Sequence, residues 1–266
     1  MTAEEWDSLR SPVGVFDRVL ILDEVASTQE EAVRRAGGRP GLAVIARRQV
    51  GGRGRQGRPW HDSGGRSLSM SMAVSSRLPA AGLSLAVGLG IIDACESLGV
   101  RGLGLKWPND VVEAESCAPG RKLAGVLIEV SHGLTVVGVG LNVAQRDDDW
   151  SAELAGRAVS LRQLGLELTR PAVARAVLEG VSQWLSATPA QIRHRWMEIG
   201  TLRERHCVFT VDGRRVEGVV VDLNSAWRLV LHGEDGRRIR IDGAHAHLEQ
   251  LGDQQRWEVS HGSGGS

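Results

Sequence analysis

The amino-acid sequence predicts an α+β protein in two parts. Up to residue 199, apolar runs typical of strands alternate with helical patterns, as where the run Arg18–Val25 (RVLILDEV) precedes a helix start at Ser27. After Gly200 the pattern changes to short strands separated by Asp-Gly turns. The first part would therefore combine strands and helices, and the second would be a small β-barrel-like domain.

The first part divides into elements with recognisable start and stop signals. Ser27 and Glu30 form a capping-box pattern that opens a helix, and Pro79 stands near the start of another. Strands are expected at 18–25, 42–50, 67–75, 122–130 and 134–143. Residues 102–110 are expected to form a short strand and a turn, and residues 111–112 to continue as strand. Helices are expected at 28–36, 79–98, near 159–164, 170–186 and 189–199.

The second part carries shorter strands. They are expected at 208–211, 216–223, 228–231 and 237–241. The resulting domain organisation is a lead-in at 1–18, a mixed domain at 19–199, a β domain at 200–251 and a flexible tail at 252–266, which ends in HGSGGS.

Composition restricts the class of protein. Lys+Arg and Asp+Glu both number 32, which argues against a dedicated nucleic-acid or membrane-surface binder. Cys95, Cys117 and Cys207 lie far apart and form no metal or disulfide pattern, as expected for a reducing cytoplasm. The N-terminus shows no signal-peptide core, and the apolar stretch Leu83–Ile92 is too short to cross a bilayer.

The loop that follows the second strand suggests an anion site. Residues 51–60 read GGRGRQGRPW, and five arginines occur between 47 and 58 with no acid among them. Glycines let the backbone approach a ligand, guanidinium groups match phosphate oxygens, and Trp60 can stack on a purine with about 1–3 kcal/mol. An exposed basic loop that binds RNA is the alternative; the loop lacks the Gly-Lys-Ser/Thr ending of a Walker A motif.

A second polar cluster is KWPND at 106–110. Pro108 restricts the backbone, so that Asn109 and Asp110 can be aimed. Asp110 could hold Mg²⁺ or accept a proton from an attacking amine. The alternative is an Asx turn beside a buried Trp107.

Two further segments fit a site for a flat, negatively charged ligand. Lys122 stands where a strand leaves a polar loop and could stabilise a carboxylate or an acyl phosphate, although an edge-strand lysine is the alternative. Gly138, Gly140 and Asn142 share one strand face, which clears room for a flat ligand with a polar group at its end. A tightly packed strand is the alternative there.

Together these segments resemble the biotin–protein ligase family. The matching stretches, in order, are Ser27-Thr28-Gln29, Gln49 with the loop 52–60, KWPND at 106–110, RKLAG at 121–125 and GVGLN at 138–142. The resemblance implies a mixed, mainly antiparallel sheet with flanking helices, as in class II synthetase-like ligases, followed by an SH3-like domain. It implies the substrates biotin and ATP, with Mg²⁺, and transfer of biotin to a lysine of a biotin carboxyl carrier domain.

The resemblance also implies residue roles. Lys122, Arg55 and Asp110 would be catalytic, with Asp110 as the metal ligand. The residues implied at biotin are Ser27, Thr28, Gln29, Gln49, Arg53, Gly54, Arg55 and Lys122. Those implied at the nucleotide are Arg58, Trp60, Lys106, Asn109 and Asn142.

Some features depart from the family pattern. Gln29 replaces the usual Asn, and the stretch 242–245 (DGAH) departs from the usual glycine–acid ending. About 18 residues precede the first strand, which is too few for the helix-turn-helix of some relatives. We therefore expect a monofunctional, cytoplasmic ligase that binds neither nucleic acid nor membrane and that pairs as a homodimer. A lipoyl or octanoyl ligase of the same fold and a nucleic-acid binder are the alternatives.

Overall fold

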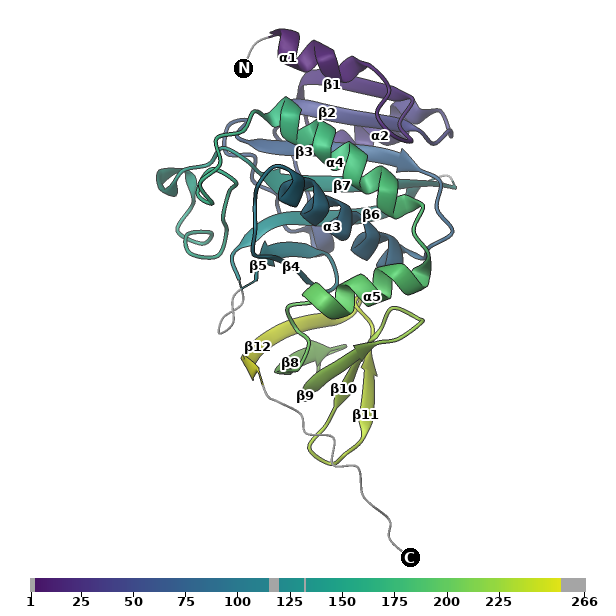
Figure 1. Ribbon diagram of the computed structural model, residues 1–266, viewed down its shortest axis with the longest axis vertical. Helices are drawn as coiled ribbons and strands as arrows, with labels where there is room; N and C mark the ends of the chain where they lie inside the picture. Colours follow the sequence, from purple (N-terminus) through teal and green to yellow (C-terminus); the bar gives the residue numbers. More distant parts are fainter. Residues whose placement is uncertain (1–2, 115–119, 132, 255–266) are drawn as a thin grey trace, which may run out of the picture. The chain divides into compact units, whose positions relative to one another are not determined.

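The structure is a computed structural model that describes residues 3–114, 120–131 and 133–254, and it divides into two units between Thr201 and Leu202. The first unit contains a seven-stranded mixed sheet with the order β1-β2-β3-β7-β6-β5-β4 (Figure 1). Its strands are β1 (Arg18–Val25), β2 (Leu42–Gln49), β3 (Ser67–Val74), β4 (Leu103–Lys106), β5 (Asp110–Glu113), β6 (Lys122–Ser131) and β7 (Leu134–Asn142). Only β1 and β2 pair in parallel among these strands; the other neighbours are antiparallel.

Helices cover both faces of this sheet. The larger helices are α2 (Thr28–Ala36), α3 (Ala80–Ser97), α4 (Arg170–Leu185) and α5 (Pro189–Ile199). Short ones are α1 (Ala3–Asp7), η1 (Ser8–Arg10), η2 (Arg55–Gly57) and η3 (Asp147–Asp149). A Cβ on Gly88 of α3 would meet Leu105, whereas a Cβ on Gly138 of β7 would meet Gln29 of α2. Since Leu105 and Gly138 belong to opposite faces of the ladder, α2 and α3 cover opposite faces.

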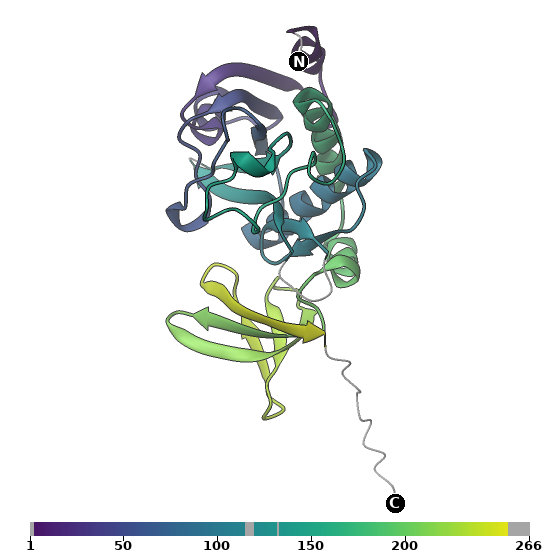
Figure 2. The ribbon, with the colours of Figure 1, turned by 90° about the vertical axis from the view of Figure 1, so that its left-hand side faces the viewer.

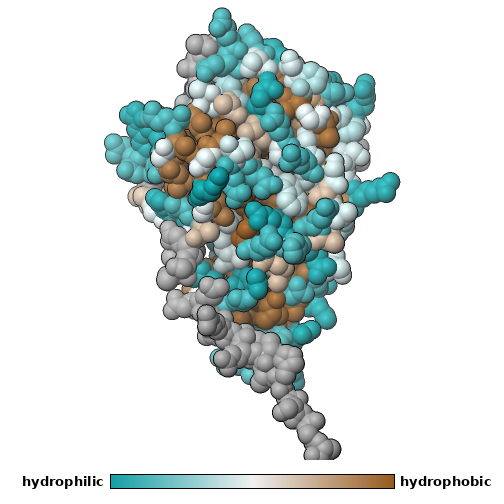
Figure 3. All heavy atoms as spheres, viewed as in Figure 1, coloured by the Kyte–Doolittle hydropathy of each residue, from teal (hydrophilic) through white to brown (hydrophobic). Residues whose placement is uncertain are grey.

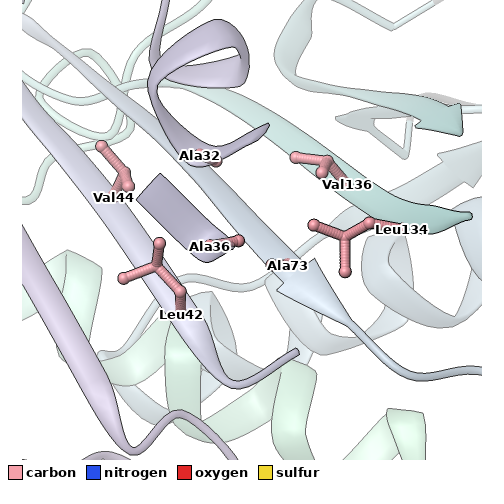
Figure 4. Close-up of a cluster of buried hydrophobic side chains, with 7 residues drawn as sticks. All are labelled: Ala32, Ala36, Leu42, Val44, Ala73, Leu134 and Val136. Atoms are coloured by element: carbon pink, nitrogen blue, oxygen red, sulfur yellow. The ribbon is translucent and has the colours of Figure 1, made fainter. Parts of the chain in front are cut away.

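A small apolar cluster fixes α2 on its face. Ala32 and Ala36 of the helix pack over Leu42 and Val44 of β2, with Ala73, Leu134 and Val136 completing the cluster (Figure 4). The two helix residues are alanines, so the helix backbone lies close to the sheet. Ser27 caps the N-terminus of α2, and Gly37 ends the helix in the left-handed region at φ 61°.

On the other face α3 and α4 pack against each other (Figure 2). A Cβ on Gly90 would lie 2.7 Å from the backbone N of Val181, and one on Gly180 would lie 2.3 Å from the carbonyl O of Gly90. By length and hydropathy α3 could cross a membrane, contrary to the expectation for Leu83–Ile92, yet 72% of it is buried inside the protein. Figure 3 shows hydrophilic and hydrophobic residues interspersed over this side of the molecule.

The second unit is a five-stranded antiparallel sheet with the order β11-β10-β9-β8-β12. Its strands are β8 (Arg205–Val211), β9 (Arg214–Leu223), β10 (Leu229–His232), β11 (Arg238–Ile241) and β12 (Ala246–Gln254). Among the described residues β11 and β12 are edges that do not pair with each other, so the strand order does not close a barrel.

Three expectations are corrected. Residues 159–164 form turns, not a helix, because Val159 and Leu161 donate their N–H groups to the carbonyls of Lys122 and Asn142 at the ends of the sheet strands. Strand β3, expected to be half-buried, is buried at all eight positions. Residues 252–254, expected in the tail, belong to β12, where Gln254 pairs with Arg205.

Other parts of the chain add to the expectations. The lead-in contains α1 and η1, and Trp6 and Leu9 are buried there. Cys95 and Cys207 are buried thiols, and burial raises the pKa of Cys95 to about 12. Cys117 and the HGSGGS ending lie outside the described residues.

The α3–α4 contact predicts a stability effect. Gly180→Ala places a methyl against the Gly90 carbonyl, so we expect it to lower the free energy of unfolding by about 1–3 kcal/mol in urea denaturation. Glu179→Ala, at an exposed position of the same helix, is the matched control and should change stability little. Equal stabilities of the two variants would contradict this close packing.

Candidate functional site

The site begins with one row of residues that crosses six strands of the sheet. The strand register places directly opposite one another, in order, Ala46, Ser69, Gly140, Gly125, Asp110 and Lys106. Directly opposite residues in an antiparallel ladder point to the same face. We call these six residues the central row. Its first four members carry little or no side chain, and its last two are charged.

Two side chains lie over the glycines of the central row. A Cβ on Gly140 would be 2.3 Å from Cε2 of Trp60, and one on Gly125 would be 2.9 Å from Nζ of Lys122. Nζ of Lys122 stands 5.8 Å from the centre of the Trp60 ring, within cation–π range. The glycines are therefore required for these close approaches of the protein's own side chains. The room for a flat ligand that the sequence predicts at Gly138 and Gly140 stays a prediction.

The N-terminus of α2 borders this floor. Ser27 accepts a hydrogen bond from the N–H of Glu30 at 3.4 Å. Oε1 of Gln49 accepts from the backbone N of Thr28 at 2.7 Å and from its hydroxyl at 3.0 Å. The structure thus brings Ser27, Thr28 and Gln49 together, as their shared predicted role requires.

Gln29 is held inside the protein. Its Nε2 donates to the carbonyl of Val136 at 3.0 Å, and its Oε1 accepts from the Ser71 hydroxyl at 3.0 Å. The Ser71 hydroxyl also lies 2.8 Å from that of Thr28. The Thr28 hydroxyl donates to Gln49 and the Ser71 hydroxyl donates to Gln29, so neither has a hydrogen left for the contact between them. The two hydroxyl oxygens can therefore still accept hydrogen bonds. A contact of Gln29 with a ligand stays a prediction.

The loop 52–60 folds back on itself as a tight turn. The N–H of Gly54 donates to the carbonyl of Arg58 at 2.7 Å, and that of Trp60 donates to the carbonyl of Gly52 at 2.9 Å. Gln56 and Gly57 adopt left-handed φ of 57° and 72°. In this turn Arg53 and Arg58 are exposed, Arg55 is partly buried, and Trp60 lies against the sheet at Gly140.

Each of two loop arginines is anchored on a different element. Arg53 forms an ion pair with Glu30 of α2, both largely exposed. Arg55 donates to Oδ1 of Asn109 at 3.0 Å, which joins the loop to the KWPND turn. Burial lowers the pKa of Arg55, and the nearby Asp110 carboxylate opposes this shift. Arg58 is exposed.

The charged end of the row is held by an ion pair. Nζ of Lys122 lies 2.7 Å from Oδ1 of Asp110, with both side chains partly exposed. Asn109 fixes this end, because its Nδ2 donates to the carbonyl of Val126 at 3.0 Å. Ser84 of α3 donates to the carbonyl of Pro108 at 3.1 Å. Lys106 lies opposite Asp110 in the ladder.

Asn142 lies on the same face as Gly138 and Gly140, as predicted. It is buried, and its Nδ2 donates to the carbonyls of Lys122 at 3.2 Å and Val159 at 3.1 Å. Asn142 therefore ties two strand ends together. A contact with a nucleotide stays a prediction.

Sequence reasoning missed a buried support beneath the site. Asp62 accepts from the backbone N of Gln49 at 3.1 Å, and burial raises the pKa of this carboxyl. Arg170 donates to the carbonyls of Arg47 at 2.5 Å and Ser67 at 3.3 Å. The centre of the Trp6 ring in α1 lies 5.3 Å from Cζ of Arg170 and 5.7 Å from Cζ of Arg47. No sequence motif marks Asp62, Arg170 or Trp6. In this region the sequence offered one signal, the alternation of small polar and apolar residues in 67–75, and that signal concerns the serines of β3.

The donor set restricts a metal. No group of three His, Cys, Asp or Glu residues able to hold an ion occurs within 3–114, 120–131 and 133–254. Asp110 offers a single carboxylate, already paired with Lys122. Such a site suits Mg²⁺ only when phosphates supply most of its ligands.

The arrangement fits an elongated ligand with an anionic end. Ala46, Ser69 and the glycines give a flat floor, and Lys122 and Arg55 lie where negative charge would stand. In a partly buried site such charges stabilise anions more strongly than in water.

The chain is similar in sequence to known proteins. Residues 22–145 match the model of the biotin/lipoate A/B protein ligase family. A biotin–[acetyl-CoA-carboxylase] ligase of Mycobacterium tuberculosis is 34% identical over 229 residues, which cover 79% of this chain and 82% of that protein. The bifunctional ligase/repressor BirA of Salmonella typhimurium is 30% identical over 240 residues, 82% of this chain and 70% of BirA.

A solved structure is also similar. The biotin protein ligase from Aquifex aeolicus in complex with biotin and ATP superposes with a TM-score of 0.78 at 27% identity, covering 88% of this chain and all of that one.

The capping role of Ser27 makes a testable difference. We expect Ser27→Ala to lower the free energy of unfolding by about 1 kcal/mol, because Glu30 loses its acceptor. Ser27→Asp, which can cap the same helix, should keep the stability in the same denaturation experiment. An unchanged stability in Ser27→Ala would show that the cap contributes nothing.

Proposed function

The chain belongs to the biotin–protein ligase family, and from this premise we propose that it adenylates biotin with ATP and transfers the biotinyl group to a lysine of a biotin carboxyl carrier domain. The supporting observation is the central row, a flat floor that ends at Lys122 and Asp110 under the indole of Trp60. The names of the relatives, one a biotin–[acetyl-CoA-carboxylase] ligase, support the choice of substrate and acceptor.

In the first step a carboxylate oxygen of biotin attacks the α-phosphorus of ATP, and pyrophosphate leaves. Lys122 would leave its pair with Asp110 and neutralise the biotin carboxylate, then the acyl phosphate. Arg55 and Arg58 would contact phosphate oxygens, with Lys106 adding positive charge. The protein contributes mainly position and charge, so no covalent enzyme intermediate is needed.

Mg²⁺ fits this site as a companion of ATP. Asp110 would be its protein ligand once Lys122 has turned to the substrate, with the phosphates supplying other oxygens. When bound, the ion would neutralise charge on the departing pyrophosphate. Asn109 would orient the turn that carries Asp110.

In the second step the acceptor lysine amine attacks the acyl carbon, AMP leaves and an amide forms. The amine loses a proton, which the Asp110 carboxylate would accept. Until then the adenylate would stay under the loop 52–60, where closure excludes water and limits hydrolysis.

The direct test is incubation of the full chain with labelled biotin, Mg·ATP and a carrier domain, followed by mass measurement. We expect the carrier to gain one biotinyl group. Lipoate or octanoate in place of biotin serves as the comparison, because the matched family model includes lipoate ligases. Transfer of lipoyl or octanoyl groups without biotinylation would reverse the assignment of substrate.

Lys122 provides the first kinetic prediction. We expect Lys122→Gln to lower kcat for carrier biotinylation by about 10²–10³, since a preorganised charge at the reacting carboxylate is lost. Lys122→Arg, which keeps the charge, should lose less. A Lys122→Gln enzyme with unchanged kcat at saturating biotin and ATP would exclude this role.

Arg55 provides a prediction about retention of the adenylate. Arg55→Gly removes the link from the loop to Asn109, so the adenylate should escape and label lysines of bystander proteins. Arg66→Gly is a control, because Arg66 is exposed and pairs with Asp149 instead. Mass spectrometry of an added bystander protein counts the modified lysines. Labelling confined to the carrier in Arg55→Gly would refute retention by this contact.

Several expectations from the sequence stay predictions: a ligase without a repressor function, cytoplasmic localisation, pairing as a homodimer, and no binding to nucleic acid or membrane.

A further inference from the structure

Two polar atoms of the site, the Ser69 hydroxyl and Nε1 of Trp60, are buried without a hydrogen-bond partner among the described residues, and the hydroxyl lies within the sheet floor itself. Ser69 is 1% exposed, and its hydroxyl has no hydrogen-bond partner among the described residues. Its neighbours on the same face of β3 differ. Ser67 accepts from Nε2 of Gln145 at 2.7 Å, and Ser71 donates to Oε1 of Gln29 at 3.0 Å. Buried hydroxyls are nearly always paired, so a lone one calls for an explanation.

We propose that Ser69 is a substrate-contacting residue, whose hydroxyl bonds the ureido ring of biotin and helps to select it. This inference rests on the proposed function and extends it to a residue that no motif marks.

The position of Ser69 in the central row supports the contact. Its direct neighbours across the strands are Ala46, with one methyl group, and Gly140, with no side chain, so the floor on either side of Ser69 is flat. In the row from Ala46 to Gly125, Ser69 carries the one side-chain hydrogen-bonding group. The indole of Trp60 lies over Gly140, next to Ser69, and offers an apolar surface beside it.

The length of biotin matches the spacing along this row. Ser69 and Gly125 are two strands apart, roughly 10 Å at the usual strand separation. Lys122 lies over Gly125 and would hold the biotin carboxylate. With C–C bonds of about 1.5 Å, the five-carbon acid chain spans roughly 6 Å, so the fused rings extend over the rest of the distance to Ser69.

Two amide side chains that the family resemblance implies at biotin are engaged with other protein groups. Oε1 of Gln49 already accepts two hydrogen bonds from Thr28, and the amide of Gln29 is bonded at both ends. Ser69 keeps its hydroxyl hydrogen and its lone pairs. A urea, with one carbonyl acceptor and two N–H donors, can use either.

The test is Ser69→Ala in the full chain, with biotin affinity measured by calorimetry and KM measured for biotin and ATP. Loss of one neutral hydrogen bond predicts a Kd and a KM for biotin that rise about threefold to tenfold. The KM for ATP should not change. The Tm of the protein without biotin should stay the same or rise, because the alanine removes a buried, unpaired hydroxyl.

Ser71→Ala is the matched control, since it removes the neighbouring hydroxyl that is paired. It should lower the Tm without biotin, because Oε1 of Gln29 loses the hydrogen bond that the Ser71 hydroxyl donates to it. An unchanged Kd and KM for biotin in Ser69→Ala would overturn the proposal. So would a clearly lowered Tm in that variant, which would reveal a structural role. Failure of the wild-type chain to bind biotin would instead refute the proposed function.

Discussion

Close packing of Trp60 onto Gly140 is the contact on which the site depends. Because Gly140 has no Cβ, the indole can lie on the sheet, and the loop 52–60 is drawn over the floor with it. The neighbouring Gly125 gives Lys122 the same access. A larger residue at Gly140 would displace Trp60, and one at Gly125 would displace Lys122. The positions of the sheet floor, the Lys122 ammonium and the loop 52–60 therefore depend on one another.

Two kinds of contact surround the floor: buried hydrogen bonds to the backbone, and exposed ion pairs that a substrate can replace. The supports beneath, Asp62 and Arg170, are buried and bond backbone groups, which keeps the ends of β2 and β3 in place. The contacts above, Lys122 with Asp110 and Arg53 with Glu30, are partly or largely exposed ion pairs. Exposed pairs contribute little stability, so substrates can replace them at small cost.

Much of this arrangement was predictable from sequence because it depends on local pattern. The strands of the first unit begin within about one residue of their expected positions, and the shared face of Gly138, Gly140 and Asn142 follows from the period of a strand. Register between distant strands has no local signal, so the alignment of Ser69 with Gly140 could not be foreseen. The turns at 159–164 had apolar spacing like a helix, but bonds to strand ends replaced helical ones.

The central claim is that this floor makes and holds an acyl adenylate. The most direct measurement is rapid quenching of the full chain with excess biotin and Mg·ATP, without any acceptor, followed by quantification of biotinyl-5′-AMP. The account predicts a burst of about one adenylate per active site, retained with the protein after gel filtration. Absence of biotinyl-5′-AMP from a folded chain that still binds ATP would contradict it.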